Sequence, residues 1–449
     1  MTHRRSFLRT AAGLALGGQL RAQAPWKPSA APWKLSAADA ALLDDLSHRS
    51  FRYFWEQCDA GTGIARGRAR FDGGEYPAER RDVGSTGDTG FAITAMCIGA
   101  ERKWVARDQA RERVRATLRA YAEGPVRHEH GWFYHWINVR TGERTGATFD
   151  SAQMAVPADK NLKRPKSEVS VSDSTWLVAG ALTAKQYFHD DPEISKLASK
   201  IYERVDYRWM RNGHPTLLAH GWMPEDGFLT ARYEKYCQLA AMYLLGIASP
   251  TLALPPESWY AWERDPMEYA GFHYIGKSLL WTYQYPFAWF DLRNRREARG
   301  SRVNYFENSA TATRAHKAFC LDNGYSENLW GVTSSLSKTG YKAWGGPPKR
   351  GGMDGSVVPC AAAGSLMFTP EISLAALHAM KDRFGDKILG PYGFADAFHP
   401  ASGWVAEDVI ALDVGITLLA AENLRTGGVW KWFMANPEAQ RALNLAQIR

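Results

Sequence analysis

The chain has 449 residues, 45% of them hydrophobic, and a formal net charge of +8. This length allows a large core, while the lysines and arginines lack the clustered basic stripe of nucleic-acid-binding proteins, so we set that class aside. Five cysteines are scattered without CxxC or Cys/His spacing. We therefore expect no zinc site and no disulfide framework, and predict that the cysteines are small core residues.

The first 24 residues have the parts of a twin-arginine export signal. Arg4 and Arg5 precede Phe7 and Leu8, a short apolar run follows, and residues 22–24 (AQA) supply a cleavage site. We therefore expect export by the twin-arginine machinery, cleavage after Ala24, and a periplasmic or secreted protein. No apolar run reaches the length of a membrane span, so we expect no stable membrane insertion.

Residues 25–36 are rich in proline and alanine and are interpreted as a linker. Beyond them, apolar residues recur at the three-to-four spacing of helices, and Ser36 is expected to cap the first helix. Further helices are expected over 87–101, 105–123, 173–189, 192–207, 234–247, 269–285, 308–323, 371–384 and 406–425.

Several expected helices form adjacent pairs, and long segments rich in glycine, proline and aromatic residues separate the pairs. Long loops between helix pairs are uncommon unless they are functional. The pattern predicts an all-α toroid of helix hairpins with a mouth built from loops. Residues 128–150 alternate as in a strand and favour a small β-hairpin there, turning at Thr141-Gly142. No linker interrupts 37–449, which is interpreted as one domain.

Many tryptophans and tyrosines fall in these loop segments. Flat aromatic faces with a polar edge are typical of sites that hold sugar rings, although any single tryptophan is more often a packing residue. The tryptophans in loops are Trp132, Trp136, Trp222, Trp259, Trp262, Trp330 and Trp344.

Two acids stand out because no other charge surrounds them: Glu168 and Asp173 in SEVSVSDSTW. Inverting glycosidases use one protonated carboxyl and one carboxylate, about 6.5–9.5 Å apart. We take these two residues as acid/base candidates, with helix capping by Ser172 or Asp173 as the alternative. Other candidate acids are Asp291, for which pairing with Arg293 or Arg295 is the alternative, and Asp354, Asp396, Glu407, Asp408 and Asp413.

Other chemistries leave weaker signals. The glycine pairs at 345–346 and 351–352 lack the phosphate-binding patterns, and no G-x-S-x-G motif occurs. His128, His130 and His135 are close in sequence, but their alternation fits a surface hairpin better than a metal site. We expect no metal and no cofactor.

Ordered motifs across about residues 80–449 resemble the bacterial glucoamylase-like (glycoamylase) family. They include SEVSVSDSTWLVAGALTAKQYF, GWMPEDGFL, YLLGIASPT, YQYPFAWFDLR, DGSVVP, YGFADAF and AENLRTGGVWKWFM. The family includes the endo-β-1,2-glucanases and is related to a domain of cyclic β-1,2-glucan synthases. The resemblance implies an (α/α)6 barrel and anomer-inverting cleavage of a β-glucan without a cofactor.

The resemblance carries the family's acids onto Glu168, Asp173, Asp291 and Asp396. Members usually have Tyr-x-Glu where this chain has Tyr236-Cys237-Gln238, and an amide cannot donate a proton to a leaving group. Glu234, one helical turn earlier in the helix expected over 234–247, is the candidate replacement. The residues expected to contact an oligosaccharide or polysaccharide are Trp222, Tyr233, Tyr236, Gln238, Tyr283, Trp289, Asp291, Arg293 and Asp396.

The leading hypothesis is an exported glycoside hydrolase that cleaves a β-glucan, with the β-1,2 linkage as a candidate. Because of Gln238, three alternatives stay open. They are a transglycosylase or phosphorylase-like enzyme, a catalytically silent glycan-binding protein, and a polysaccharide lyase that uses Tyr236 as its base.

Overall fold

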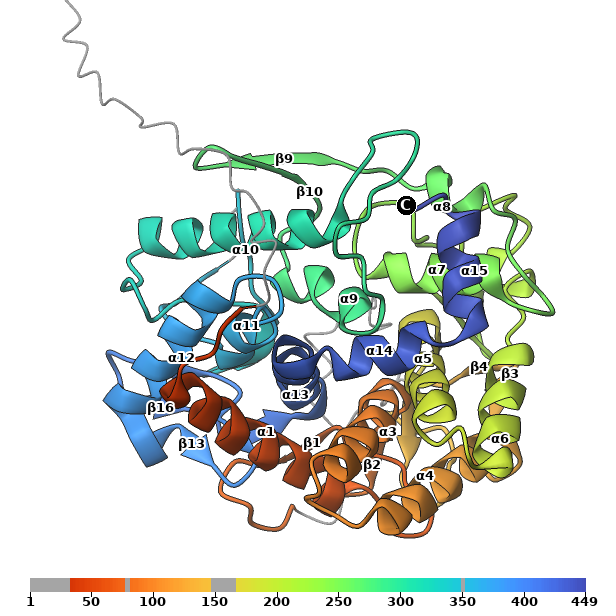
Figure 1. Cartoon of the computed structure of the whole chain (residues 1–449), viewed down its shortest axis with the longest axis horizontal. Coiled ribbons are helices and arrows are strands. Elements are labelled where there is room, and N and C mark those ends of the chain that lie inside the picture. The colour runs from red at the N-terminus through yellow and green to blue at the C-terminus, as the bar shows by residue number, and fades with distance from the viewer. Residues whose placement is uncertain (1–32, 77–80, 147–166, 349–351) are drawn as a thin grey trace, which may run out of the picture.

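Helices that are apolar on every side alternate along the chain with helices that are apolar on one side. In the first kind, such as α3 (Thr86–Glu101) and α5 (Val171–Tyr187), almost every residue is buried, whereas α4 (Arg107–Ala122) and α6 (Pro192–Glu203) bury one face. Helices of the first kind must lie inside a second layer. The structure, a computed structural model that describes residues 33–76, 81–146, 167–348 and 352–449, accordingly forms an (α/α)6 barrel (Figure 1).

The inner ring surrounds the barrel axis and the outer ring covers it (Figure 1). The described residues place in the inner ring α3, α5, α7 (Leu239–Ala248), α9 (Tyr285–Trp289), α11 (Pro359–Ala363) and α13 (Ala411–Thr426). The outer ring contains α1 (Ala37–Gln57), α4, α6, α10 (Tyr305–Asp322), α12 (Pro370–Phe384) and the C-terminal α15 (Pro437–Leu445), and the short helices α8 (Ser258–Ala261) and α14 (Gly428–Met434) complete the set.

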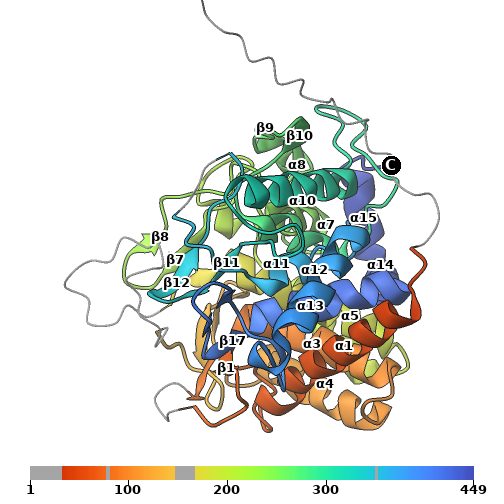
Figure 2. The same ribbon diagram turned by 90° about the vertical axis from the view of Figure 1, so that its left-hand side faces the viewer.

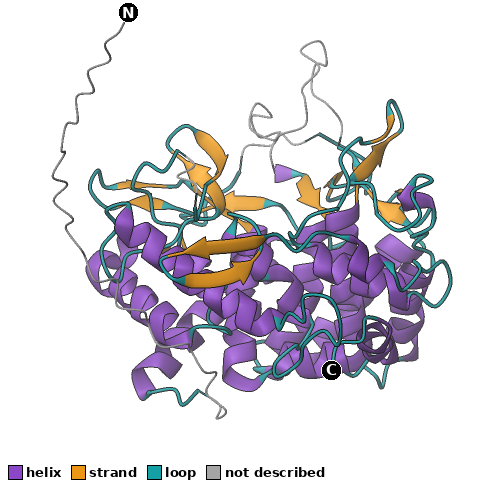
Figure 3. Cartoon of the chain, turned by 90° about the horizontal axis from the view of Figure 1, so that it is seen from above, coloured by secondary structure: helices purple, strands orange, loops and turns teal. Residues whose placement is uncertain are grey.

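Short antiparallel strands gather at one end of the barrel (Figure 2, Figure 3). Three of them lead directly into inner helices: β2 (Val83–Ser85) into α3, β6 (Val169–Ser170) into α5 and β17 (Asp408–Ile410) into α13. The N-terminal turns of these helices therefore lie at this end, which we call the mouth.

The strands pair two by two, except for the three-stranded sheet β6-β7-β8. The partners are β1 (Arg68–Arg70) with β17, β2 with β5 (Trp136–Asn138), β3 (His128–Glu129) with β4 (Trp132–Phe133), β7 (Gly221–Met223) with β6 and β8 (Gly227–Phe228), β9 (Pro266–Tyr269) with β10 (Phe272–Ile275), β11 (Ser334–Ser337) with β12 (Gly340–Ala343), β13 (Leu389–Gly390) with β14 (Gly393–Phe394), and β15 (Phe398–His399) with β16 (Trp404–Val405).

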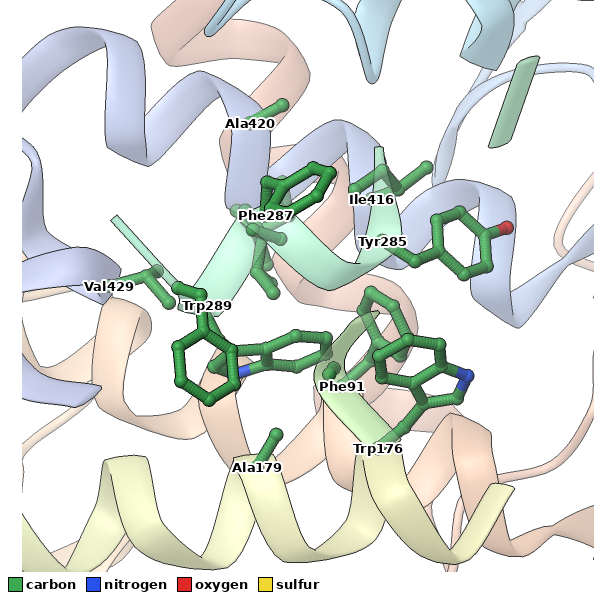
Figure 4. Close-up of a cluster of buried hydrophobic side chains, with 14 of the residues drawn as sticks. Phe91, Trp176, Ala179, Tyr285, Phe287, Trp289, Ile416, Ala420 and Val429 are labelled. Carbon is green, nitrogen blue, oxygen red and sulfur yellow. The ribbon is translucent and has the colours of Figure 1, made fainter. Parts of the chain in front are cut away.

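Large aromatic side chains fill the barrel axis behind the mouth (Figure 4). Trp176 of α5 stacks on Trp289 of α9 with ring centroids 5.7 Å apart, and Phe91 of α3 meets the edge of Trp289 at 4.8 Å. The indole nitrogen of Trp289 donates a hydrogen bond to Thr94 at 3.2 Å. The barrel interior around Trp289 is therefore a packed core.

Most of the expected helices are confirmed within a few residues, including the first one, which Ser36 caps through a reciprocal pair of hydrogen bonds with Asp39. The helix expected over 269–285 is wrong. Ala270 and Gly271 have positive φ angles of 50° and 79° and join β9 to β10 as a hairpin, because a two-residue turn of this kind suits paired strands. The helix expected over 234–247 begins only at Leu239.

The turn expected at Thr141-Gly142 is confirmed: the Gly142 amide donates to the Asn138 carbonyl at 2.8 Å, and Ile137 pairs with Arg144. All five cysteines are buried and unpaired. Residues 1–24 and residues 25–32 of the expected linker lie outside the described residues. Among the described residues, no helix is both long enough and apolar enough to cross a membrane.

Helices α3 and α5 approach so closely that their backbones touch. A Cβ atom on Gly90 would lie 2.1 Å from the carbonyl oxygen of Trp176, and one on Gly180 would lie 2.2 Å from the carbonyl oxygen of Gly90. Both distances are far below van der Waals contact, so only glycine allows this crossing.

We therefore predict that Gly180→Ala forces the two helices apart and lowers the free energy of unfolding by at least about 2 kcal/mol, as overpacking does in other cores. Chemical denaturation followed by far-UV circular dichroism measures the change. Gly61→Ala is the matched control, because its new Cβ would meet only the Asp59 carboxylate at an ordinary 3.5 Å. Equal stability of the two variants would contradict the prediction.

Candidate active site

Three neighbouring inner helices each carry an aspartate at the third position of their first turn, at the mouth. These residues are Asp88 in α3, Asp173 in α5 and Asp413 in α13, and all three are at least nine-tenths buried. The positive end of a helix dipole favours a carboxylate at this position. In α5 the cap is Ser170, whose hydroxyl accepts from the Asp173 amide at 3.2 Å and donates to the Asp173 carboxylate. Asp173 thus completes a cap made by Ser170.

His135 stands between the two acids that the sequence singled out. Its Nδ1 lies 3.1 Å from Oε1 of Glu168, and its Nε2 lies 3.7 Å from Oδ1 of Asp173. The ring stacks on Trp136 with centroids 4.3 Å apart. Glu168 and Asp173 are therefore brought together as predicted, but an imidazole occupies the space between them.

This arrangement determines the protonation states of His135 and Glu168. Burial alone would lower the pKa of His135, but the charges of Asp173 and Glu168 outweigh it and raise the pKa to about 9. Burial would raise the pKa of Glu168, but the charge and the hydrogen bond of His135 hold it below its usual value. At neutral pH His135 is a cation and Glu168 is ionised.

A second acid pair, Asp396 and Asp413, holds a proton instead. Burial and then the negative charge of Asp413 raise the pKa of Asp396 well above its usual value, and burial raises the pKa of Asp413 to about 6. The two side chains share a hydrogen bond, which Asp396 donates because it holds the proton more tightly. Asp396 also accepts from the Leu336 amide at 2.5 Å, and Asp413 accepts from the Tyr285 hydroxyl at 3.3 Å.

Asp88 lies between the two groups. Burial and the charge of Asp173 raise its pKa well above the usual value, and its own charge contributes to the raised pKa of Asp413. We call Glu168, His135, Asp173, Asp88, Asp413 and Asp396 the acid arc.

Residues that precede α7 adjoin the acid arc. The Gln238 amide nitrogen reaches the Ser172 hydroxyl at 3.5 Å, which places it at the first turn of α5, the turn that carries Asp173. Tyr233 is buried against His220, with ring centroids 4.2 Å apart. Burial chiefly raises the pKa of Tyr233, and Asp173 and Glu168 lie close enough to add to it. Tyr233 and Gln238 therefore belong to the same region as the predicted acids.

Glu234 does not take the position that was expected of it. Residues 234–238 are not helical, so Glu234 does not stand one turn from Gln238 on a helix face. Its side chain is exposed, and its backbone carbonyl accepts from the Glu263 amide at 2.7 Å. The reason given for it as a replacement acid is wrong.

Several predicted contact residues lie away from the acid arc. Tyr236 and Tyr283 are buried with ring centroids 5.3 Å apart, and Trp289 is part of the core (Figure 4). Asp291 and Arg293 form an exposed ion pair of 2.8 Å just past the C-terminal end of α9, at the barrel end opposite the mouth. The alternative interpretation of Asp291 describes it correctly.

The tryptophans in loops also divide into those near the acid arc and those buried elsewhere. Trp222 is half-buried on β7, beside Val169 of β6, and Trp136 is half-buried against His135. The other five are almost fully buried: Trp132, Trp259, Trp262, Trp330 and Trp344. A sugar platform at the mouth therefore has to be built from Trp136 and Trp222 among these seven.

Sequence reasoning missed His135 and Asp88. His135 was assigned to a surface hairpin, because its contacts with residues 168 and 173 cannot be derived from local pattern. Asp88 did leave a signal: the Ser-x-x-Asp of residues 85–88 repeats the Ser-x-x-Asp of residues 170–173 at the start of the next inner helix. Among the residues described, no group of three or more His, Cys, Asp or Glu side chains is arranged to hold a metal ion.

A family model and a curated protein both match this chain. The Glycoamylase family model, described as "Putative glucoamylase", matches residues 230–437. A curated relative, the exo beta-1,2-glucooligosaccharide sophorohydrolase (non-reducing end) of Parabacteroides distasonis, is 27% identical over 91% of this chain. The chain spans only 58% of the length of that relative.

Solved structures agree over nearly the whole length of both chains. The endo-β-1,2-glucanase of Chitinophaga pinensis, in complex with sophorotriose and glucose, has a TM-score of 0.79 and 26% identity and covers 93% of this chain and 99% of its own. A protein of Bacteroides fragilis described as a putative glucoamylase has a TM-score of 0.80 and 29% identity, with coverages of 94% and 99%.

The raised pKa of His135 makes a prediction about stability. A histidine whose pKa rises on folding stabilises the protein fully below its unfolded pKa of about 6.5, and this contribution is lost as the pH rises through its folded pKa. The unfolding free energy of the native protein minus that of His135→Gln should therefore fall between pH 6.5 and pH 9, by up to about 3 kcal/mol. Urea denaturation at several pH values measures it.

His220→Gln is the control for this titration. Burial lowers the pKa of His220, so this residue is neutral in both the folded and the unfolded protein once the pH exceeds the unfolded pKa of about 6.5 by roughly one unit. The difference in unfolding free energy between the native protein and His220→Gln should therefore not change with pH in that range. A flat difference for His135→Gln as well would contradict the prediction.

Proposed function

The chain belongs to the glucoamylase-like family, and on that premise we propose that it is a glycoside hydrolase that cleaves a β-glucan, with β-1,2-linked glucose chains as the substrate. The relatives named as sophorohydrolase and endo-β-1,2-glucanase support the substrate class. The acid arc supports the chemistry, because its carboxyl groups are divided between protonated and ionised states. Such a division is what glycosidic hydrolysis by two carboxyl groups requires.

In this proposal the proton-holding pair and the ionised acid have different roles. Asp396 keeps its proton when Asp413 has lost its own, because burial and the charge of Asp413 raise the pKa of Asp396 well above its usual value, so Asp396 is assigned as the donor to the leaving oxygen. Glu168 is assigned as the carboxylate that takes a proton from the attacking water. Asp173 is not assigned as its partner, because His135 fills the space where the water would have to stand between Glu168 and Asp173.

We predict that Glu168→Gln and Asp396→Asn each lower kcat by roughly 10²- to 10⁴-fold, the usual contribution of general acid–base catalysis. A reducing-end assay on β-1,2-, β-1,3-, β-1,4- and α-linked glucans measures the rate, and NMR of the first products should show the inverted anomer. Activity should decline at high pH, where Asp396 loses its proton, because burial and the charge of Asp413 raise its pKa well above the usual value.

Asp44→Asn is the control for these variants, because it removes an outer-surface carboxylate that pairs with Arg425 at 2.8 Å. Its rate should equal that of the native protein. Full activity of either active-site variant would refute its assigned role, and clean protein that releases nothing from any glucan would refute the function.

Gln238 supports a second candidate, transfer of the glycosyl group to a sugar acceptor instead of water. An amide that reaches Ser172 at the first turn of α5 stands where the family usually has a carboxylate, and fewer carboxylates leave fewer groups to activate water. Products longer than the substrate, detected by mass spectrometry, would favour transfer.

We also propose that the protein is exported by the twin-arginine machinery, because residues 1–24 have the composition of such a signal. Replacing Arg4 and Arg5 by lysine should retain the protein in the cytoplasm, whereas replacing Arg21 by lysine should not. Cell fractionation followed by immunoblotting measures the distribution. Equal export of the native protein and the double variant would contradict this route.

A further inference from the structure

We propose that His135 is a positioning residue of the active site: a cation clamped between Glu168 and Asp173 that fixes the Glu168 carboxylate in the orientation and the ionised state needed to take a proton from water. This inference rests on the proposed hydrolytic function and gives a role to a residue outside its two assigned acids.

The contacts of the ring support this role. Nδ1 donates to Glu168 at 3.1 Å, Nε2 faces Asp173 at 3.7 Å, and Trp136 covers one face at 4.3 Å between centroids. Only 15% of the His135 side chain and 19% of the Glu168 side chain are exposed. Both nitrogens of the ring are thus directed at carboxylates, and little water is available to replace either contact.

The backbone that carries the ring is held on both sides by hydrogen bonds. The His135 amide donates to the Glu168 carbonyl at 2.9 Å, and the His135 carbonyl accepts from the Thr86 amide at 3.0 Å. On either side, Tyr134 pairs with Val169 and Trp136 pairs with Ser85. The backbone of His135 is therefore tied both to Glu168, just before β6, and to the first turn of α3, so the imidazole starts from a fixed point between two elements of the mouth.

The surrounding charges explain why a cation is needed here. The charges of Asp173, Glu168 and Asp88 all act on His135, and besides His135 the charge that lowers the pKa of Glu168 is that of Arg144. Arg144 is already engaged by Glu225 at 2.6 Å. Without the imidazolium, Glu168 would be a largely buried carboxylate beside a second carboxylate, and both burial and like charge favour its protonated form.

The same geometry argues against His135 as the proton donor to the leaving group. A donor must direct an N–H at the glycosidic oxygen, and here the ring nitrogens face Glu168 and Asp173. A proton that left His135 would also remove the cation between two acids. The geometry therefore assigns His135 to holding Glu168, and the proton donor is sought elsewhere in the acid arc.

The test is the pH dependence of kcat/KM for His135→Gln on the glucan that the native protein cleaves. Gln keeps a neutral hydrogen-bond donor but no charge. We expect the rising limb of the profile, which reports ionisation of Glu168, to move up by about one pH unit or more, while the falling limb that belongs to Asp396 and Asp413 stays in place. A drop in rate without movement of the rising limb would overturn the proposal, because a merely structural role gives that result.

His378→Gln is the matched control. It removes another histidine–carboxylate contact, to Asp39 at 2.9 Å, which joins α12 to α1 on the outer ring. Both limbs of its profile should coincide with those of the native protein.

A second measurement decides the proposal even if His135→Gln does not fold or no glucan is cleaved. In protein labelled with ¹³C-histidine, one ring signal, that of His135, should titrate near pH 9 and at least one unit lower in Glu168→Gln, and this shift assigns the signal. Titration near 6.5 in both proteins would overturn the clamp. Absence of cleavage by the native protein with a normal titration would refute the proposed function and leave the clamp standing.

Discussion

The close contact of α3 and α5 is the constraint on which the mouth depends. Because Gly90 and Gly180 let the two backbones touch, the first turns of both helices lie side by side, and Asp88 and Asp173 come with them. Two like charges would then meet in a buried place, which is unfavourable unless one is neutral or a cation intervenes. The structure uses both solutions, since Asp88 is neutral and His135 faces Asp173. The packing of two apolar helices thus determines the electrostatics of residues that sequence alone presents as separate acids.

The acid arc buries several carboxyl groups near each other, and their negative charge is compensated or removed in different ways. Glu168 and Asp173 receive a cation, Asp396 and Asp413 share a proton, and Asp88 is protonated in the gap between them. Helix dipoles also stabilise negative charge on the three aspartates that lie at helix starts. The protonation state of each group also decides which proton transfer it can perform, because a carboxylate beside a cation can accept a proton and a buried acid pair can donate one. A glycan cleft that needs both capacities can therefore arise from the way in which one barrel end accommodates its charges.

How much of this could be predicted depended on whether the determining contacts were local. Helix starts were predicted well where the chain marks them, as at Ser36, and the proximity of Glu168 to the start of α5 followed from their separation by only two residues. The helix expected over 269–285 failed because its aromatic spacing fits a helix, while the Ala270-Gly271 turn that decides the matter does not depend on that spacing. Trp289 was expected in the cleft, yet burying so large an apolar side chain is favourable, and the axis of the barrel had room for it. His135 could not be found at all, since its partners are 33 residues away and more.

Gln238 takes on a different meaning when the charges of the mouth are considered together. Its amide reaches Ser172, the neighbour of Asp173, so a carboxylate there would add a further negative charge to a region in which His135 is the cation between the acids. That charge would raise the pKa values of the acids around it and would weaken the distinction between ionised Glu168 and the proton-holding aspartate pair. The neutral amide preserves this distinction and at the same time removes a group that could have donated a proton. In the proposed mechanism, proton donation then falls to the buried aspartate pair on the opposite side of Asp88, and the rate would depend on how tightly that pair keeps its proton.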